Sequence, residues 1–266
     1  VKVLKAREVD GQEKFLGDAV VRNGKLVVTM GGFALRTFAL QVAPPEATVE
    51  QPAVFEMPLV FDKDVVSTDD NRSNGRMDER GISYPAEQFP SALTVNGIQF
   101  NLGQTFTGKN NAMVCRGQKI DVPKTGNYDY VYLLAAAVTD TSGIFRTGSM
   151  KHNLAFRSFT GMIGQFDHRT WDEFGRISGL EKGFIHRDEV AWFATHMHCD
   201  TSNLPYRYGY IYLYKLPLPA GTATIQVPEN EAMVLFAMTF ARSSFENAVP
   251  AMPLYDDFTG REAMQL

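Results

Sequence analysis

The fold of this chain is decided by the stretch Tyr130-Val-Tyr-Leu-Leu-Ala-Ala-Ala-Val138, which contains the longest apolar run of the sequence. The run is far too short to cross a lipid bilayer, and its length is typical of a strand covered on both faces. Aromatic and β-branched side chains at its start suit a pleated sheet. The stretch therefore predicts a buried β-strand.

Similar apolar runs, separated by turn residues, extend from this stretch in both directions. Two-residue hairpin signals occur at Asp10-Gly11 and Asn23-Gly24, and Gly, Pro and Asn clusters separate the later runs. No segment keeps a helical period for long. The predicted strands beyond the first 42 residues are Phe55–Phe61, Ile98–Leu102, Asn111–Val114, Tyr130–Val138, Leu154–Phe159, Ala191–His198, Tyr208–Lys215, Ala223–Val227 and Met233–Ala241.

The sequence thus predicts an all-β fold with a small β-meander or sandwich piece followed by a larger jelly-roll-like β-sandwich. Residues 1–42 form the small piece, and the prolines of residues 43–53 predict an extended linker. Residues 54–242 form the larger sandwich. Residues 243–266 lack a clear pattern and predict a tail that packs on the surface.

Composition restricts the partners of the chain. It has 266 residues, 44% of them hydrophobic, and a net charge of −4 with acids and bases interspersed. We therefore expect neither nucleic acid nor membrane as a partner, and a neutral polar ligand such as a sugar fits better. Cys115 and Cys199 are compatible either with one disulfide or with two buried thiols. The compartment stays open, with a periplasmic or secreted location favoured.

The sharpest candidate for chemistry is the segment from Trp192 to Asp200. His196 and His198 share one strand face, because side chains two residues apart point the same way. Asp200 or a distant acid could complete a metal site with them. We favour hydrogen-bonded histidines in a polar cleft over a metal, since His-x-His alone has poor specificity.

A mixed polar and aromatic segment, residues 164–173, is typical of carbohydrate contacts, in which an aromatic face meets the C–H side of a pyranose and planar polar groups meet its hydroxyls. A polar loop anchored by its tryptophan is the alternative. The predicted carbohydrate-binding residues are Glu87, Asp167, Arg169, Trp171, Arg187, His196 and His198.

Two further patterns favour structural roles. The acid-rich run over residues 68–81 lacks EF-hand spacing, so we interpret it as a solvated turn and not a calcium loop. Tyr206, Tyr208, Tyr210, Tyr212 and Tyr214 share one strand face, and we favour a half-buried sheet face over a sugar platform. No catalytic motif surrounds Glu87, Asp167, Asp172, Asp188 or Glu189, so we expect no catalysis by this chain.

Short stretches near the N-terminus resemble a known family. Arg7-Glu-Val-Asp-Gly-Gln-Glu-Lys14, Asn23-Gly-Lys-Leu-Val27 and Leu35-Arg-Thr-Phe-Ala-Leu40 resemble the last strands of family 38 glycoside hydrolases, the α-mannosidases. Later stretches, among them Cys115-Arg-Gly-Gln118 and Gly164-Gln-Phe-Asp167, resemble a C-terminal module of some bacterial members. Residues 1–42 would then be the final strands of the glycosidase β-sandwich.

The resemblance implies a non-catalytic accessory region that supports the catalytic domain of the same polypeptide and binds a mannose-containing glycan. The family's zinc ion and catalytic acids belong to that other domain, so we expect no cofactor and no catalytic residue in this chain. Since the chain starts at Val1 within a strand-like pattern, we expect a longer parent protein. The alternatives are an independent carbohydrate-binding module and, less favoured, an autonomous hydrolase.

Overall fold

The computed structural model describes residues 2–44 and 54–242. The chain divides into two compact units, Val1–Gln51 and Pro52–Leu266, and the division falls within the predicted linker. Every regular element in the described ranges is a β-strand, and no helix there is long and apolar enough to cross a membrane. The all-β prediction is therefore confirmed. Most of the predicted linker and all of the predicted tail lie outside the described residues.

The first unit contains a sheet with strand order β2-β1-β5 and a separate hairpin of β3 and β4. Its strands are β1 (Val3–Val9), β2 (Phe15–Asp18), β3 (Val20–Arg22), β4 (Lys25–Val27) and β5 (Thr37–Val42). Between β3 and β4, Asn23 and Gly24 have φ angles of 51° and 76°, which confirms the predicted two-residue turn.

The predicted turn at Asp10-Gly11 is wrong in detail. The connection runs from Asp10 to Lys14, and the Asp10 carboxylate accepts hydrogen bonds from the backbone N–H groups of Gln12 at 2.8 Å and Lys14 at 2.9 Å. Glu13, with a φ of 62°, takes the left-handed conformation expected of the glycine. A longer connection, in which the Asp10 side chain accepts hydrogen bonds from backbone N–H groups of the loop, therefore takes the place of the two-residue turn.

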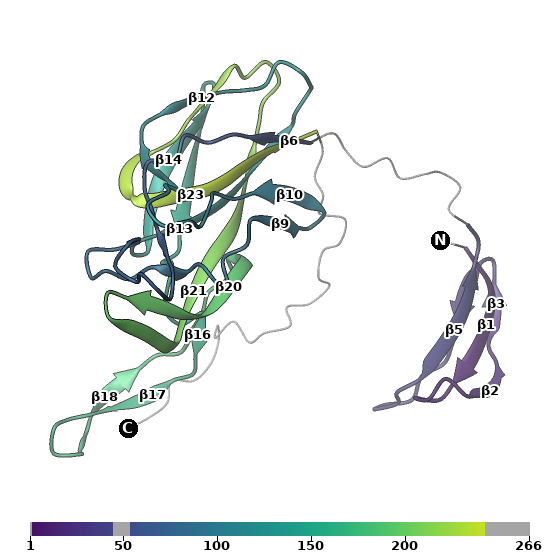
Figure 1. Ribbon diagram of the computed structural model, residues 1–266. Helices are drawn as coiled ribbons and strands as arrows, with labels where there is room; N and C mark the ends of the chain where they lie inside the picture. The colour runs from purple at the N-terminus through teal and green to yellow at the C-terminus, as the bar shows by residue number, and fades with distance from the viewer. Residues whose placement is uncertain (1, 45–53, 243–266) are drawn as a thin grey trace. The chain divides into compact units, whose positions relative to one another are not determined.

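The second unit is built around a six-stranded sheet (Figure 1), ordered β11-β23-β13-β21-β20 with β6 added to β23. Its strands are β6 (Val54–Met57), β11 (Met113–Arg116), β13 (Tyr130–Ala137), β20 (Glu189–Cys199), β21 (Ser202–Pro217) and β23 (Glu229–Ala241). Strand β13 lies between β23 and β21, and its residues from Val131 to Ala137 are buried. The predicted buried strand is confirmed, and leucines at this depth contribute about 1.5–3 kcal/mol each.

A four-stranded sheet, ordered β12-β22-β14-β15, supplies the other layer of a β-sandwich. Its strands are β12 (Lys119–Asp121), β14 (Thr141–Thr147), β15 (Met150–Phe156) and β22 (Thr224–Gln226). Phe145, Phe156 and Ile225 of this sheet belong to the same buried cluster as β13. The ring of Phe156 stacks on Tyr214 of the larger sheet, with 4.3 Å between centroids, so the two layers share one core.

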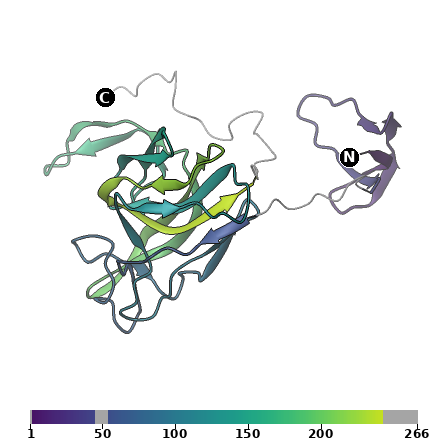
Figure 2. The same cartoon turned by 90° about the horizontal axis from the view of Figure 1, so that it is seen from above.

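Four short strand pairs in the described part of this unit are separate from its two main sheets. They are β7 (Val66–Ser67) with β8 (Tyr84–Pro85), β9 (Ala92–Val95) with β10 (Ile98–Asn101), β16 (Gly164–Gln165) with β19 (Phe184–Ile185), and β17 (His168–Trp171) with β18 (Ile177–Glu181). The last two pairs form one ribbon over residues 164–185, here called the arm. In Figures 1 and 2 the arm extends away from the two sheets.

Both cysteines are free thiols in the structure. Cys115 is buried in β11, and burial raises the pKa of its thiol to about 12. Cys199 lies at the end of β20 and is partly exposed. The disulfide alternative is therefore wrong, and only one of the two thiols is buried.

Candidate functional site

Two acidic side chains meet because of a short parallel strand pair. Strands β7 and β8 pair in parallel, with Ser67 opposite Pro85. Asp69 and Glu87 each follow two residues later, so they leave the pair side by side. The backbone N–H of Asp69 donates to Glu87 Oε1 at 2.8 Å, which fixes this arrangement.

His198, on strand β20, lies beside Asp69 and Glu87. It forms an antiparallel bridge with Ser83, in which each backbone N–H donates to the other residue's carbonyl, at 3.0 and 3.1 Å. The imidazole is fully buried, and its Nδ1 lies 2.9 Å from Ser67 Oγ, which in turn lies 2.6 Å from Ser83 Oγ. The other ring nitrogen, Nε2, is buried without a hydrogen-bond partner. It lies 3.5 Å from Asp69 Oδ1.

Asp69, Glu87 and His198 thus form one cluster. Each offers one ligand atom, and these atoms lie within 4.8 Å of one another. Both carboxylates are exposed and the histidine is buried, so the cluster opens to solvent on its acidic side. One imidazole and two carboxylates form a donor set used for zinc and other divalent transition metals.

Arg72 and Asn203 orient Asp69. The Arg72 Nη2 lies 2.5 Å from Asp69 Oδ1, its Nη1 donates to the Asp69 carbonyl, and its Nε donates to Asn203 Oδ1 at 2.7 Å. Asn203 Nδ2 donates weakly to the same Oδ1, at 3.4 Å. These contacts hold the Asp69 carboxylate toward His198.

His196 lies beside His198, with 5.4 Å between ring centroids, so the two side chains meet as the sequence predicted. Gln88 Nε2 lies 3.1 Å from His196 Nδ1, and Gln88 also bonds Thr195. Burial lowers the pKa of His198 below its usual value, although the nearby carboxylates of Glu87 and Asp69 oppose the shift. His198 is therefore neutral at neutral pH and has a nitrogen lone pair to offer.

Asp200, the acid predicted to complete a site with the two histidines, lies elsewhere. Its Oδ1 is 3.6 Å from Arg76 Nη2, and it does not belong to the three-residue cluster. The chain reverses after Cys199 at the end of β20, which takes Asp200 away from the histidine face. Sequence reasoning missed Asp69, because it lies in the run interpreted as a solvated turn and the β7–β8 register has no sequence pattern.

Three of the predicted carbohydrate-binding residues lie on the arm, apart from this cluster. Trp171, at the end of β17, is 61% exposed. Asp167 Oδ1 accepts a hydrogen bond from the Gly183 backbone at 2.5 Å, and Arg169 lies opposite Leu180 in the β17–β18 pair. Arg187 lies between β19 and β20. The predicted residues therefore lie in three places: on the arm, in or beside the cluster (Glu87, His196 and His198), and, for Arg187, between β19 and β20.

The tyrosines of β21 form a row. Successive rings from Tyr208 to Tyr214 lie 6.5, 6.0 and 6.5 Å apart. Tyr210, Tyr212 and Tyr214 are buried, whereas Tyr206 is 86% exposed. Burial raises the pKa of Tyr212 and Tyr214. The buried part of the row is a sheet face, as the favoured interpretation predicted.

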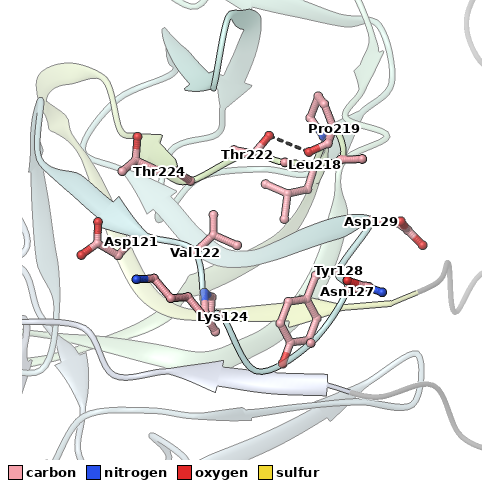
Figure 3. Close-up of a pocket in the computed structure, with 15 residues that line it drawn as sticks. Asp121, Val122, Lys124, Asn127, Tyr128, Asp129, Leu218, Pro219, Thr222 and Thr224 are labelled. Atoms are coloured by element: carbon pink, nitrogen blue, oxygen red, sulfur yellow. Dashed lines mark hydrogen bonds between the residues drawn. The ribbon is translucent and has the colours of Figure 1, made fainter.

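A separate pocket of about 570 Å³ lies between residues 121–129 and residues 218–224. Figure 3 shows its lining, including Asp121, Lys124 and Tyr128 on one side and the hydrogen bond from Thr222 Oγ1 to the Pro219 carbonyl, 2.7 Å, on the other. None of the predicted site residues lines this pocket.

Comparison with known proteins supports the architecture. Residues 51–244 match the family model described as AziU2-like beta-sandwich domain. No curated protein matches the chain. Neither finding links it to family 38 glycoside hydrolases, so the origin implied by the resemblance stays a prediction.

Proposed function

Because the chain belongs to the AziU2-like β-sandwich domain family, its architecture is established while its ligand is open, and we propose that it is a non-catalytic accessory domain that binds carbohydrate through the arm. The observation that carries the proposal is the exposed indole of Trp171 on a ribbon that extends from the sandwich (Figure 1). An exposed aromatic face is the group that stacks on the C–H side of a sugar ring.

The arm offers more than one aromatic ring. Phe166 is 71% exposed and Phe174 is 72% exposed, and Arg176 lies over the Phe174 ring at 5.1 Å. Exposed apolar side chains gathered on one element are typical of interaction surfaces. Polar groups on the same ribbon, such as His168 and Glu181 at 3.1 Å, supply hydrogen-bonding partners for hydroxyl groups.

A non-catalytic role is supported by the arginine contacts of two acidic side chains, Asp172 and Asp188. Asp172 Oδ2 lies 2.9 Å from Arg176, and Asp188 Oδ2 lies 2.6 Å from Arg157. Hydrogen bonds from the Arg176 backbone and side chain lower the pKa of Asp172. A glycosidase acid needs a raised pKa, so Asp172 does not suit that task, and the Asp188 carboxylate is already paired with Arg157.

The accessory part of the proposal follows from the resemblance of residues 1–42 and is supported by the surface of the first unit. Among its described residues, the buried apolar side chains are Ala6 and Val9. Its exposed ones include Leu4, Phe15, Leu16, Val20, Val27, Leu40 and Val42. A small sheet with so much exposed apolar surface suits a unit that supports a neighbouring domain.

Two tryptophans make the binding proposal testable by fluorescence. Trp171 is exposed, whereas Trp192 packs against Tyr84 and Phe89 with ring centroids 5.9 and 5.5 Å apart. Titration with mannan oligosaccharides should change the emission of Trp171, and Trp171→Ala should weaken binding at least about tenfold by calorimetry. Phe106→Ala, which removes an exposed ring outside the arm, is the matched control and should bind normally.

Two results would contradict the binding proposal. One is an absence of heat and of fluorescence change with every mannoside and mannan oligosaccharide tested. The other is full affinity in Trp171→Ala, which would place the ligand away from the arm. Turnover of a nitrophenyl α-mannoside by the chain would contradict the non-catalytic part. Unchanged yield and polymer cleavage by a parent α-mannosidase without this region would contradict the accessory part.

A further inference from the structure

We propose that Asp69, Glu87 and His198 bind a divalent transition-metal ion, with zinc as the reference ion. This inference concerns a different site from the arm, so its failure would leave the carbohydrate proposal intact. It also differs from the sequence-based expectation that this chain binds no metal. The residues considered as metal ligands from the sequence were His196, His198 and Asp200, and the proposed site keeps only His198 of these.

The spacing of the three residues suits a single ion. Zinc binds nitrogen and oxygen at about 2.0–2.2 Å, which places neighbouring ligands of a tetrahedral site roughly 3.3 Å apart. His198 Nε2 and Asp69 Oδ1 are already 3.5 Å apart, and all three ligand atoms lie within 4.8 Å. Glu87 is exposed and is held beside Asp69 by the hydrogen bond from the Asp69 N–H to its Oε1, so binding needs only a rotation of its carboxylate toward the ion.

The orientation of His198 supports the same conclusion. With the proton on Nδ1, His198 donates to Ser67 Oγ at 2.9 Å, and Ser67 then donates to Ser83 Oγ at 2.6 Å. In this tautomer the Nε2 lone pair faces Asp69, and the two serine contacts hold the ring in that orientation. Nε2 is fully buried and has no hydrogen-bond partner, so its position near two acids calls for a positive centre.

The donor set identifies the class of metal. A neutral imidazole beside two carboxylates favours zinc and neighbouring first-row ions, whereas calcium and magnesium prefer oxygen ligands alone. Besides these two carboxylates, the groups that act electrostatically on His198 are the guanidinium of Arg72, which pairs with Asp69, and the imidazole of His196. A divalent ion therefore has negative charge left to balance, since Arg72 offsets only one of the two acids.

Metal uptake by the full chain tests the proposal. After treatment with a chelator, wild-type protein should bind one equivalent of Co²⁺, seen as visible d–d absorption that Zn²⁺ abolishes. Asp69→Asn and Glu87→Gln keep side-chain shape on an exposed surface, and each should weaken Co²⁺ binding at least about tenfold. Glu181→Gln is the matched control, because Glu181 faces His168 at 3.1 Å on the arm outside the three-residue cluster. It should bind like wild type.

Failure of wild-type protein to take up Co²⁺ or Zn²⁺ would overturn the proposal. So would wild-type affinity in both Asp69→Asn and Glu87→Gln. Far-UV circular dichroism and the melting temperature without metal confirm that the variants are folded, so the test does not depend on His198→Ala, which removes a buried side chain. Titration of the same variants with mannan oligosaccharides reports on the arm separately.

Discussion

Ser67 Oγ and His198 Nδ1 are 2.9 Å apart in the interior, although 131 residues separate them in the sequence. The contact joins β7 to β20 and fixes the ring whose other nitrogen faces Asp69. The imidazole itself is neutral because it is buried, and the loss of solvation lowers its pKa. This contact and the surrounding burial lead to a pH dependence of folding.

Protonation of His198 should destabilise the fold. Burial lowers its folded-state pKa below the usual 6.5, so the unfolded chain binds the proton more readily. The stability that the neutral ring provides is present above pH 6.5 and is lost as the pH falls toward the lowered pKa. Urea denaturation between pH 8 and pH 5 should show a smaller decline in His198→Gln than in wild type. Parallel declines would contradict the assignment.

Arg157 should stabilise the fold through ion pairs with two carboxylates of unequal burial. Its Nε lies 2.6 Å from Asp188, whose side chain is 17% exposed, and its Nη1 lies 3.1 Å from Asp140, which is 48% exposed. Asp188→Asn should cost about 1–2 kcal/mol in the free energy of unfolding, and Asp140→Asn less. Thermal denaturation at pH 7 compares them, and equal or reversed losses would contradict this ranking.

The contribution of the Asp140 carboxylate to the stability of the fold should disappear at acidic pH. Partial burial acts to raise the pKa of Asp140, but hydrogen bonds from the Ser158 backbone and Arg157 outweigh it and lower the pKa below 3.8. The carboxylate therefore stabilises the fold above that pH, and its effect is lost as the pH falls through the lowered pKa. The difference between wild type and Asp140→Asn should shrink below pH 4, and a constant difference would argue against an ionised partner.

Gly75 should tolerate no side chain. A Cβ there would lie 2.1 Å from the backbone oxygen of Val66 in β7, so Gly75→Ala has to displace the strand that precedes Asp69. We expect a loss of about 1–3 kcal/mol, as for other overpacked sites. Gly31→Ala is the control, because no atom lies within 4 Å of its Cβ position. Equal stability of the two variants in urea would contradict the close approach.

The two thiols should react very differently. Hydrogen bonds from the Ser202 side chain and the Thr201 backbone lower the pKa of Cys199, whereas burial raises that of Cys115 to about 12. Iodoacetamide at neutral pH should label Cys199 alone, and Cys199→Ser should abolish this labelling in the folded protein. Cys115 should react after unfolding. Rapid labelling of Cys115 in native protein would show that β11 opens locally.

Long apolar strands were predictable because their signal is local. The run from Val131 to Val138 and the Asn23-Gly24 turn carry their own pattern, and each of the nine predicted strands overlaps an observed one. The arm was missed as a ribbon and interpreted as a polar segment. Its turn signal was present, since Gly175 has a φ of 72° and Asp172 accepts the Phe174 and Arg176 amides.

The acidic cluster was only half predictable. The His-x-His spacing placed His196 and His198 together, and Glu87 was among the predicted carbohydrate-binding residues. Asp69 joins them through the parallel pairing of β7 and β8, two residues each, which is too short to leave a period in the sequence. The matched family itself could not be predicted from the resemblance, which rests on strand and turn residues that unrelated β proteins share.

The position of β23 has a consequence for biosynthesis. This strand, Glu229–Ala241, is the last of the described strands, yet it lies within the sheet and pairs with β6, β11 and β13. A ribosome delivers those three partners first and the strand that joins them last. The larger sheet therefore has no complete interior until Ala241 has left the exit tunnel, and folding of this unit has to wait for nearly all of it to be translated.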